Sequence, residues 1–418
     1  MDQTDVCIIG AGPGGSTAAL HLAKAGINCT LLDKAVFPRD KICGDALSGK
    51  VVSELRRIDE NLLPALHKNT QALPSGGIHF IAPNEQWLSI PFTSTGSATT
   101  HLSLPDEQES APGYLMRRVD FDSFLTDQVQ QSACIDFRQA TEVTDYQKTE
   151  YGWQLTTNQR TTLQTRLLIV ANGAQSNFTR HVAGISQEPR HYCAGLRAYY
   201  QGVEGLDANG FIELHFLKPF LPGYFWIFPL ANGAANVGVG MLSEAVSQRK
   251  IHLKNSMLDL IKTHPTLRHR FVNARLTGDI RGYGLPLGSK RHQLSGDGYL
   301  LTGDAGHLID PFTGEGISNA MISGRWAAHQ AVKSLGAGDY SARFLAGYDF
   351  AVYRRLGSEL KISTRLQQLL AYPALFNMVV NRANRNPALK QLLSSMFNDI
   401  DLRTSLRNPA FYAKLLFQ

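Results

Sequence analysis

The sequence has little of several features that would place it in a specialised class. No uncharged apolar run approaches the ~18 to 20 residues that a helix needs to span a bilayer. The five cysteines are widely spaced and include no C-x-x-C pair, which argues against a disulfide framework and against a metal site. Lysine and arginine form no dense cluster interleaved with aromatic residues, so nucleic acid is not indicated. We expect a cytoplasmic protein with reduced thiols, soluble or peripheral at the inner face of the membrane.

The composition is that of an ordinary globular protein. The chain has 418 residues, of which 43% are hydrophobic and 18% charged, and its length suggests two or three domains. A formal net charge of +6 would suit an anionic ligand or an acidic membrane surface, although spread over this length it is weak evidence.

The most informative segment is a glycine turn near the N-terminus. Gly10, Gly12 and Gly15 keep the G-x-G-x-x-G spacing between a predicted strand at residues 6–9 and a predicted helix at residues 16–25. The first glycine allows a tight turn, the second lets a pyrophosphate approach the backbone, and the third lets the helix lie close to the sheet. The phosphates would rest on the N-terminus of this helix.

A second strand follows the helix and ends at Asp33, roughly 20 residues after the turn, where a carboxylate can bind ribose hydroxyls. Strand, turn, helix and acid together predict a dinucleotide site. They do not distinguish FAD from NAD.

A second type of pattern occupies the middle of the chain. Residues 191–241 read as strand after strand, rich in aromatic and β-branched residues, which predicts an antiparallel sheet inserted into the nucleotide-binding domain. Residues 251–271 read as helix. A strand, a glycine turn and a helix reappear after residue 299, so we expect the first domain to resume near residue 282.

Four further segments carry chemistry. They are KICGDALSG (residues 41–49), RRVDFDSFL (117–125), PGYFWIFPL (222–230) and LLTGDAGHLIDPFTGEGISNAM (300–321). Together with the glycine turn, they resemble motifs of the FAD-dependent oxidoreductases with the aromatic-hydroxylase fold, and within them of the geranylgeranyl reductase family. The resemblance covers nearly the whole chain.

The resemblance implies an α/β fold class: a Rossmann-like FAD-binding domain with an inserted antiparallel β-sheet substrate domain and a helical C-terminal region. The expected boundaries are 1–75, 112–185 and 280–358 for the FAD-binding domain, 76–111 and 186–279 for the substrate domain, and 359–418 for the C-terminal region.

The resemblance also implies which residues contact FAD. Asp304 would bind the ribityl chain, while Gly314, Gly316 and Ile317 would bring backbone N–H groups and a helix start beside the flavin ring, where they stabilise an anionic reduced flavin. Arg118 would lie near the flavin and the pyrophosphate. The expected cofactor-binding residues are Gly10, Gly12, Gly14, Gly15, Asp33, Cys43, Gly44, Ala46, Arg118, Asp304, Gly314, Gly316 and Ile317.

The aromatic segment predicts the substrate side. On a strand, Tyr224, Trp226 and Phe228 share one face and can form an apolar wall for a substrate without polar groups. An aromatic stripe with a period of two also suits an ordinary core. The related flavin-dependent halogenases carry W-x-W-x-I-P, whereas this chain has Tyr224 and Phe228 where those have Trp and Ile, which favours the reductases.

The catalytic residues that we predict are Cys43 and Tyr224, either of which could protonate a substrate carbon. For Cys43, contact with the ring, redox activity and an inert buried thiol remain alternatives. Arg197 is a candidate for the substrate pocket that could bind a head group, and strand packing is its alternative interpretation.

The predicted function is FAD-dependent reduction of carbon–carbon double bonds in a polyprenyl, geranylgeranyl-type lipid or a similar apolar substrate, by hydride transfer from reduced flavin. The alternatives are a flavin-dependent monooxygenase or halogenase, and a non-catalytic flavoprotein electron carrier. Asn172-Gly173 stands where the fold usually has Asp-Gly, so NADPH, NADH and ferredoxin all remain possible electron donors, the last as a partner protein. A peripheral membrane contact would suit a lipid substrate.

Overall fold

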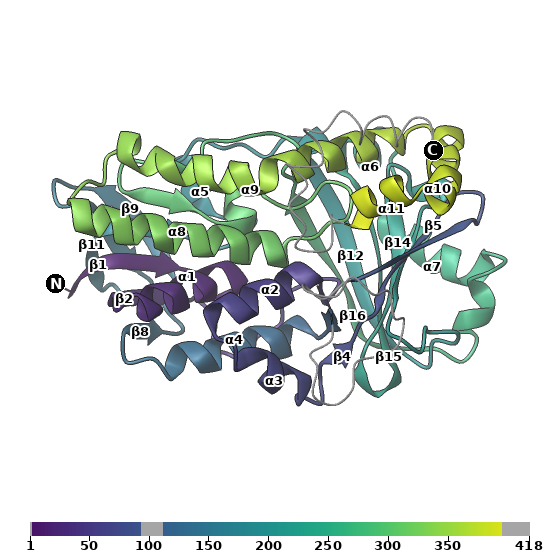
Figure 1. Cartoon of the computed structure of the whole chain (residues 1–418), viewed down its shortest axis with the longest axis horizontal. Coiled ribbons are helices and arrows are strands. Elements are labelled where there is room, and N and C mark those ends of the chain that lie inside the picture. Colours follow the sequence, from purple (N-terminus) through teal and green to yellow (C-terminus); the bar gives the residue numbers. More distant parts are fainter. Residues whose placement is uncertain (1, 93–111, 395–418) are drawn as a thin grey trace. The chain divides into compact units, whose positions relative to one another are not determined.

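The computed structural model describes residues 2–92 and 112–394, whose contacts divide the chain into two compact units (Figure 1). Unit 1 comprises Met1–Lys41, Arg118–His191 and Leu285–Leu360, and unit 2 comprises Ile42–Arg117, Tyr192–Gly284 and Lys361–Gln418. Residues 93–111, which we assigned to the substrate domain, and residues 395–418 of the C-terminal region lie outside the described residues.

Unit 1 is built on a mainly parallel sheet with the strand order β17-β18-β11-β1-β2-β8, and β10 and β9 extend it beside β11. The C-terminal halves of the central strands β1 and β11 are buried because they are continuous apolar runs, as in a sheet covered on both faces. Its strands are β1 (Asp2–Ile9), β2 (Cys29–Leu32), β8 (Ile135–Arg138), β9 (Val143–Lys148), β10 (Trp153–Thr157), β11 (Thr162–Val170), β17 (Ser295–Gly296) and β18 (Tyr299–Leu301).

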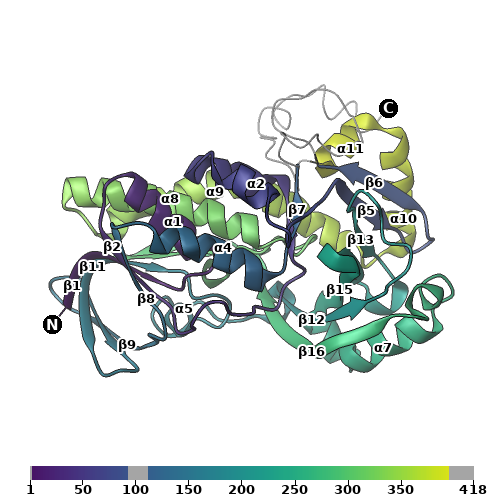
Figure 2. The same ribbon diagram turned by 90° about the horizontal axis from the view of Figure 1, so that it is seen from below.

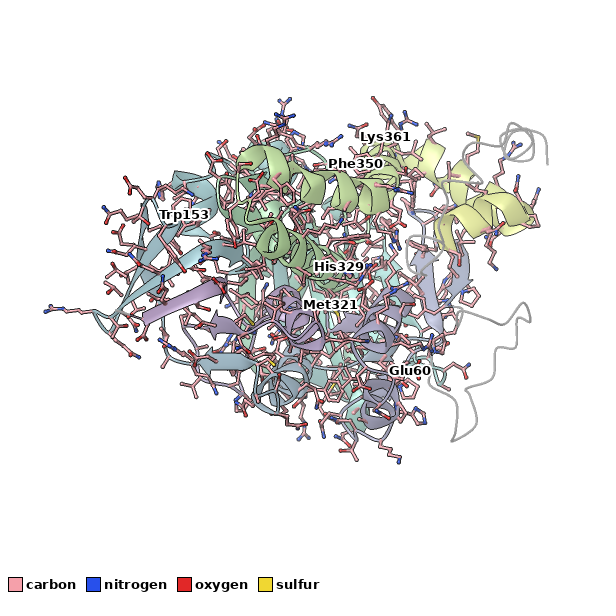
Figure 3. The ribbon with its side chains drawn as sticks, turned by 60° about the vertical axis from the view of Figure 1, so that its left-hand side comes forward. Glu60, Trp153, Met321, His329, Phe350 and Lys361 are labelled. Atoms are coloured by element: carbon pink, nitrogen blue, oxygen red, sulfur yellow. The ribbon has the colours of Figure 1, made fainter. Side chains whose placement is uncertain are left out.

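The helices of unit 1 pack closely on one another at glycines. A Cβ atom at Gly324 would lie 2.2 Å from the carbonyl oxygen of Gly14, so α1 and α8 touch backbone to backbone. Figure 1 shows the two helices side by side, and Figure 3 shows Met321 and His329 on α8. The helices are α1 (Pro13–Lys24), α4 (Arg118–Gln130), α5 (Asn177–His181), α8 (Ile317–Ala337) and α9 (Ala342–Leu369), of which the last runs on into unit 2 after Leu360, with 3₁₀ turns at Pro189–His191 and Gly303–Gly306.

Unit 2 contains a seven-stranded sheet with the order β16-β12-β15-β14-β13-β5-β6. Strand β15 runs antiparallel to β12 and β14, as do β13 to β14 and β5 to β6, whereas β13 and β5 run parallel. The strands are β5 (Gly77–Ile81), β6 (Trp87–Pro91), β12 (Tyr192–Gln201), β13 (Ile212–His215), β14 (Gly223–Pro229), β15 (Ala234–Leu242) and β16 (Arg275–Pro286).

Helices complete unit 2. The C-terminal helices pack against the β5–β6 end of the sheet (Figure 2), where the rings of Phe376 and Phe216 have centroids 4.8 Å apart and the Asn384 side chain donates to the carbonyl of Trp87. The helices are α2 (Gly49–Ile58), α3 (Leu62–His67), α6 (Ser243–Gln248), α7 (Leu253–Thr263), α10 (Pro373–Arg385) and α11 (Pro387–Ser394), with 3₁₀ turns at Lys218–Phe220, Ala231–Gly233 and Arg268–Phe271.

The contacts of residues 42–75 differ from our domain prediction, which gave them to the FAD-binding domain. They group with unit 2, where Asn236 donates to the Cys43 carbonyl and to Asp45, and Ser75 donates to the Gly210 carbonyl. Strands β3 (Ala46–Leu47) and β4 (Leu73–Pro74) both pair with β7 (Tyr114–Leu115) in a small separate sheet. The α/β fold class with an inserted sheet is confirmed. No helix within residues 2–92 and 112–394 is long and apolar enough to cross a membrane.

Candidate functional site

The glycine turn after β1 depends on close backbone contacts. Gly10 has a φ of +99°, and a Cβ atom there would lie 2.5 Å from the carbonyl oxygen of Ala171. A Cβ atom at Gly15 would lie 1.8 Å from the carbonyl oxygen of Gly10. Gly14 faces α8, where a Cβ atom would lie 3.2 Å from the Ala320 carbonyl oxygen. Gly10 and Gly15 are therefore required by the turn, whereas a side chain at Gly14 would only crowd its neighbours on α8.

The N-terminus of α1 suits an anion. Its N-cap is Gly12, no side chain caps it, and its first turn has no acidic residue. A Cβ atom at Gly12 would meet only guanidinium groups within 4 Å, with Nη2 of Arg39 at 3.6 Å and Nη2 of Arg118 at 4.0 Å. The N-terminus of α1 and two guanidinium groups therefore lie beside Gly12, where no side chain covers the backbone. This arrangement suits the negative charge of a dinucleotide's pyrophosphate.

One buried carboxylate holds both guanidinium groups. Asp122 accepts from Nε and Nη2 of Arg118 at 2.7 and 2.8 Å and from Nη1 of Arg39 at 2.5 Å. Burial, the largest single effect, opposes its ionisation, but the charges of Arg118 and Arg39 outweigh it and lower the pKa of Asp122. The Asp122 carboxylate thus stays charged and orients both cations. We did not predict Arg39 or Asp122.

Asp33 lies directly after β2 and is 7% exposed. Its carboxylate accepts from the backbone N–H groups of Ala11, at 2.7 Å, and Ala35, at 2.8 Å. The first bond ties the acid to the glycine turn, so Asp33 is fixed beside the place where the ribose is expected.

The second predicted FAD motif gathers around the start of α8. Gly316 is the N-cap of α8, Ile317 is its first residue, and the helix has neither a side-chain cap nor an acid in its first turn. Oδ1 of Asp304 lies 3.4 Å from where a Cβ atom at Gly316 would stand, and its Oδ2 is 2.9 Å from Nζ of Lys41. Polar groups suited to a ribityl chain thus lie beside an open helix end.

The loop before α8 is shaped by Asp310. Its Oδ1 accepts from the backbone N–H groups of Phe312, at 3.0 Å, and Thr313, at 2.8 Å, and its carbonyl accepts from Gly314 N–H at 3.0 Å. Gly314 has a φ of +73°, which favours glycine. Asp310, which we did not single out, therefore presents the predicted Gly314–Ile317 segment.

An unsatisfied atom beside the glycine turn also suits a ligand. Among the described residues, Oδ1 of Asn172 is buried and has no hydrogen-bond partner. The Cα atom of Asn172 lies 2.9 Å from where a Cβ atom at Gly10 would stand. Buried acceptors are normally satisfied, so this one is consistent with a donor supplied by a bound molecule. The residues of unit 1 fit FAD on these grounds.

In unit 2, β14 has two different faces. Phe225 and Ile227 lie in the hydrophobic core of the sheet. The alternate residues Tyr224, Trp226 and Phe228 form a row on the other face, with successive ring centroids 6.1 and 6.2 Å apart. We call this row the aromatic wall. Trp226 and Phe228 are buried, with 8% and 7% exposure, whereas Tyr224 is half-buried.

The aromatic wall is fixed to the loop that contains Cys43 by Asn236 of β15. Nε1 of Trp226 donates to Oδ1 of Asn236 at 2.9 Å, while Nδ2 of Asn236 donates to the Cys43 carbonyl and to Oδ2 of Asp45, each at 2.7 Å. Asn236 and Asp45 are fully buried. Neither was predicted, although an isolated Asn in the apolar segment AANVGVGML is a signal of a buried polar role.

The remaining predicted residues of unit 2 lie around this network. A Cβ atom at Gly44 would lie 2.8 Å from Cε2 of Phe228, so the loop rests on the end of the aromatic wall. Ala46 begins β3. Arg197 on β12 is 3% exposed, and its Cζ lies 4.0 Å from the ring centroid of Tyr199.

The predicted cofactor residues therefore divide between the units. Unit 1 brings together the glycine turn, Asp33, Arg118 and the start of α8, whereas Cys43, Gly44 and Ala46 belong to unit 2 with the aromatic wall. The roles of the individual residues remain predictions.

Comparison with known proteins supports this interpretation. Residues 3–198 match the family model described as FAD binding domain. The chain is 30% identical over 411 residues to a menaquinone reductase of Mycobacterium tuberculosis, covering 96% of this chain and 93% of the relative. It is 28% identical over 380 residues to the digeranylgeranylglycerophospholipid reductase of Methanococcus vannielii, covering 88% of each.

Solved structures share the fold. A geranylgeranyl bacteriochlorophyll reductase-like protein from Thermoplasma acidophilum has a TM-score of 0.74 at 24% identity, covering 91% of each chain. A flavin-dependent brominase variant has a TM-score of 0.73 at 21% identity, covering 99% of this chain and 100% of its own. With the FAD-binding geometry of unit 1 and the extent of the match to the menaquinone reductase, the chain belongs to the geranylgeranyl reductase family of FAD-dependent oxidoreductases.

Proposed function

We propose that this enzyme reduces carbon–carbon double bonds in the polyprenyl chain of a lipid. The observation that carries the proposal is the aromatic wall, because Tyr224, Trp226 and Phe228 present three rings on one sheet face opposite the packed core. An isolated alkene has no group for hydrogen bonding or charge pairing, so it is bound by apolar contact alone.

The names of the relatives support the same substrate class. Menaquinone and digeranylgeranylglycerophospholipids have different head groups, but both carry polyprenyl chains with isolated double bonds. The feature that they share is the chain, which is what an aromatic surface can bind.

Bound FAD, once reduced by NADPH, NADH or ferredoxin, supplies hydride equivalents. An unactivated alkene accepts hydride poorly, so a positioned acid must protonate the other carbon. Cys43 and Tyr224 are our candidates. The bond from Asn236 to the Cys43 carbonyl holds the peptide of that candidate in place relative to Trp226.

The test is anaerobic reoxidation. FAD-loaded protein is reduced with dithionite and mixed with geranylgeranyl compounds or menaquinone, and flavin absorbance and product mass are followed. We expect oxidised flavin to return together with a product that has gained one H₂ per reduced bond. The Trp226→Leu variant should lose most of this rate, whereas Trp87→Leu, at a tryptophan that is 48% exposed on β6, should retain it. Failure of every prenyl compound to reoxidise the flavin would refute the proposal.

A second candidate is a flavin-dependent halogenase or monooxygenase, which the fold shared with the brominase favours. Such an enzyme requires oxygen. Substrate-dependent oxygen uptake with a halide-dependent gain in product mass would establish it, and turnover without oxygen would eliminate it.

A further inference from the structure

We propose that the outer side of α10 binds the surface of a phospholipid bilayer that contains anionic lipids. This helix belongs to unit 2 and includes none of the predicted FAD-binding or catalytic residues. Binding to a bilayer requires no turnover, so this property goes beyond the proposed reductase function and does not depend on it.

Helix α10 has apolar residues on two sides. On its inner side, Phe376 and Val380 are buried. On its other side, Tyr372 at the N-cap, Leu375 and Met378 follow one another at intervals of three and are 66%, 41% and 58% exposed. We call these three residues the outer row. The side of a helix that is turned away from a protein core is normally polar, so the packing of α10 does not explain the outer row.

The segment that carries the outer row has charges of one sign. Residues 361–394 contain five lysines and arginines and no aspartate or glutamate. Lys361 and Arg365 are exposed near the end of α9, and Arg385 is exposed on α10 two turns after Met378, on the same side of the helix. None of these three cations forms an ion pair with another of the described residues. A negatively charged partner would therefore be attracted to this segment.

An apolar row next to exposed cations is typical of helices that lie in the interface of a bilayer. Their apolar side chains enter the boundary between head groups and acyl chains, while lysine and arginine are attracted to the anionic head groups. With 13 residues, α10 is too short to span a bilayer, which takes about 20 residues, but long enough to lie on its surface.

Two other occupants of the outer row fit the charges less well. A second copy of this chain in a two-fold contact would present the same row and the same cations, so like charges would face each other. Residues 395–418 contain three basic and two acidic residues, so they supply no excess of negative charge. An anionic bilayer surface supplies both the negative charge and the apolar interior.

The inner side of α10 connects this surface to the aromatic wall. Phe376 packs against Phe216 with ring centroids 4.8 Å apart, and the Phe216 ring lies 5.7 Å from that of Tyr224. One helix backbone, roughly 5 Å across at its Cα atoms, thus separates the outer row from rings that contact the aromatic wall. A bilayer bound at the outer row would bring its apolar contents close to that wall.

The test measures binding to vesicles without turnover. Full-length, FAD-loaded protein is mixed with vesicles of phosphatidylcholine alone, or of phosphatidylcholine with roughly one third phosphatidylglycerol, and the bound fraction is measured by sedimentation. We expect a partition coefficient at least tenfold higher on the anionic vesicles. It should fall as sodium chloride is added, because salt screens the attraction.

A double variant tests the apolar contribution. Leu375→Ser combined with Met378→Ser should lower the partition coefficient on anionic vesicles at least tenfold, because two apolar side chains no longer enter the bilayer. The melting temperature should stay the same, since both side chains are exposed. The matched control is Val272→Ser combined with Leu276→Ser, which removes two exposed apolar side chains of unit 2 outside α10 and should leave the partition coefficient unchanged.

A charge variant tests the attraction. Arg385→Gln should weaken binding to the anionic vesicles about fivefold and leave binding to phosphatidylcholine unchanged, because one cation near an anionic surface contributes roughly that factor. Arg343→Gln, the same substitution at an exposed arginine of α9 in unit 1, is its control and should have no effect.

Three results would overturn the proposal. They are equal binding to the two kinds of vesicle, a double variant at Leu375 and Met378 that binds as the unaltered protein does, and a double variant that instead has a lower melting temperature or a smaller oligomer. The last result would mean that the chain itself or a second copy covers the outer row. The reductase proposal is judged separately, since vesicle binding as expected without prenyl-dependent reoxidation would refute only the reductase.

Discussion

The indole ring of Trp226 lies against Gly238 on the neighbouring strand, so that a Cβ atom at Gly238 would fall 2.2 Å from Cζ2 of the ring. The same atom would fall 2.2 Å from the carbonyl oxygen of Leu196, on the strand at the other side. The ring of Trp226 can therefore take this position only where the facing residue has no side chain.

We predict that Gly238→Ala displaces Trp226 and lowers the free energy of unfolding by about 1 to 3 kcal/mol. Prenyl-dependent reoxidation of the flavin should fall at least tenfold, while the Kd for FAD stays within threefold. Gly336→Ala is the control, because a Cβ atom at this position on α8 would meet no neighbour within 4 Å. Replacing a helical glycine by alanine should stabilise α8 slightly. Equal activities of the two variants would show that the position of Trp226 is unimportant for turnover.

Substitutions at two glycines of the turn can test folding and cofactor binding separately. Gly15→Ala should prevent the turn from forming, because its Cβ would lie 1.8 Å from the carbonyl oxygen of Gly10. Gly12→Ala meets only two guanidinium groups at ordinary contact distances, so the apoprotein should keep its melting temperature and bind FAD at least tenfold more weakly. Flavin fluorescence titration and thermal melting measure the two effects. A Gly12→Ala protein with unaltered FAD affinity would contradict this account.

Arg39 should contribute to FAD affinity without being essential to the fold. In Arg39→Met, Asp122 keeps both of its bonds to Arg118, so its charge remains paired. We expect a Kd for FAD that is about tenfold to a hundredfold higher, with a weaker dependence on salt. Arg166→Met, which removes a half-exposed arginine near Asp5, is the matched control and should leave the Kd unchanged. A fall in melting temperature with unaltered Kd would mean that Arg39 is purely structural.

His307 should make stability depend on pH. Burial, followed by the neighbouring His292, lowers its pKa to about 4, against the attraction of Asp304 and Glu188. In the unfolded chain its pKa is about 6.5. The unfolded state thus binds more protons between these values, and stability falls as the pH is lowered from 6.5 to 4.

His307→Asn should remove about 3 kcal/mol of this pH dependence in urea unfolding, because the pKa is lowered from 6.5 to about 4 and one pKa unit corresponds to about 1.4 kcal/mol. Asparagine tolerates the left-handed backbone at this position, where φ is 52°. The exposed His181→Asn is the control, and its curve should match that of the unaltered protein. If the pH dependence of stability persists in full in His307→Asn, it must arise from other titratable groups.

The local parts of the site were predictable because their evidence is contiguous in the sequence. Gly10, Gly15 and Asp33 lie within one strand–turn–helix–strand unit, whose spacing alone indicates a dinucleotide. The sharing of one face by Tyr224 and Trp226 likewise follows from the period of a strand.

The parts that were not predicted depend on partners far apart in the chain. Asp122 reads as an ordinary acid on an amphipathic helix, and only the fold brings Arg39, 83 residues earlier, to its side. Asp45 and Asn236 are 191 residues apart. A single sequence contains no signal that pairs such residues. No strands were predicted within residues 77–91, where β5 and β6 lie, because each of them is only five residues long.

The contact between Gly14 and Gly324 has a mechanical consequence. Gly14 belongs to the glycine turn, which is expected to hold the pyrophosphate, and Gly324 lies on α8, whose start is expected to lie beside the flavin. At this contact the backbones of α1 and α8 touch, so no side chains lie between them that could change rotamer and let one helix slide past the other. The two helices should therefore move as one stiff block, and any motion that admits a substrate must arise outside it.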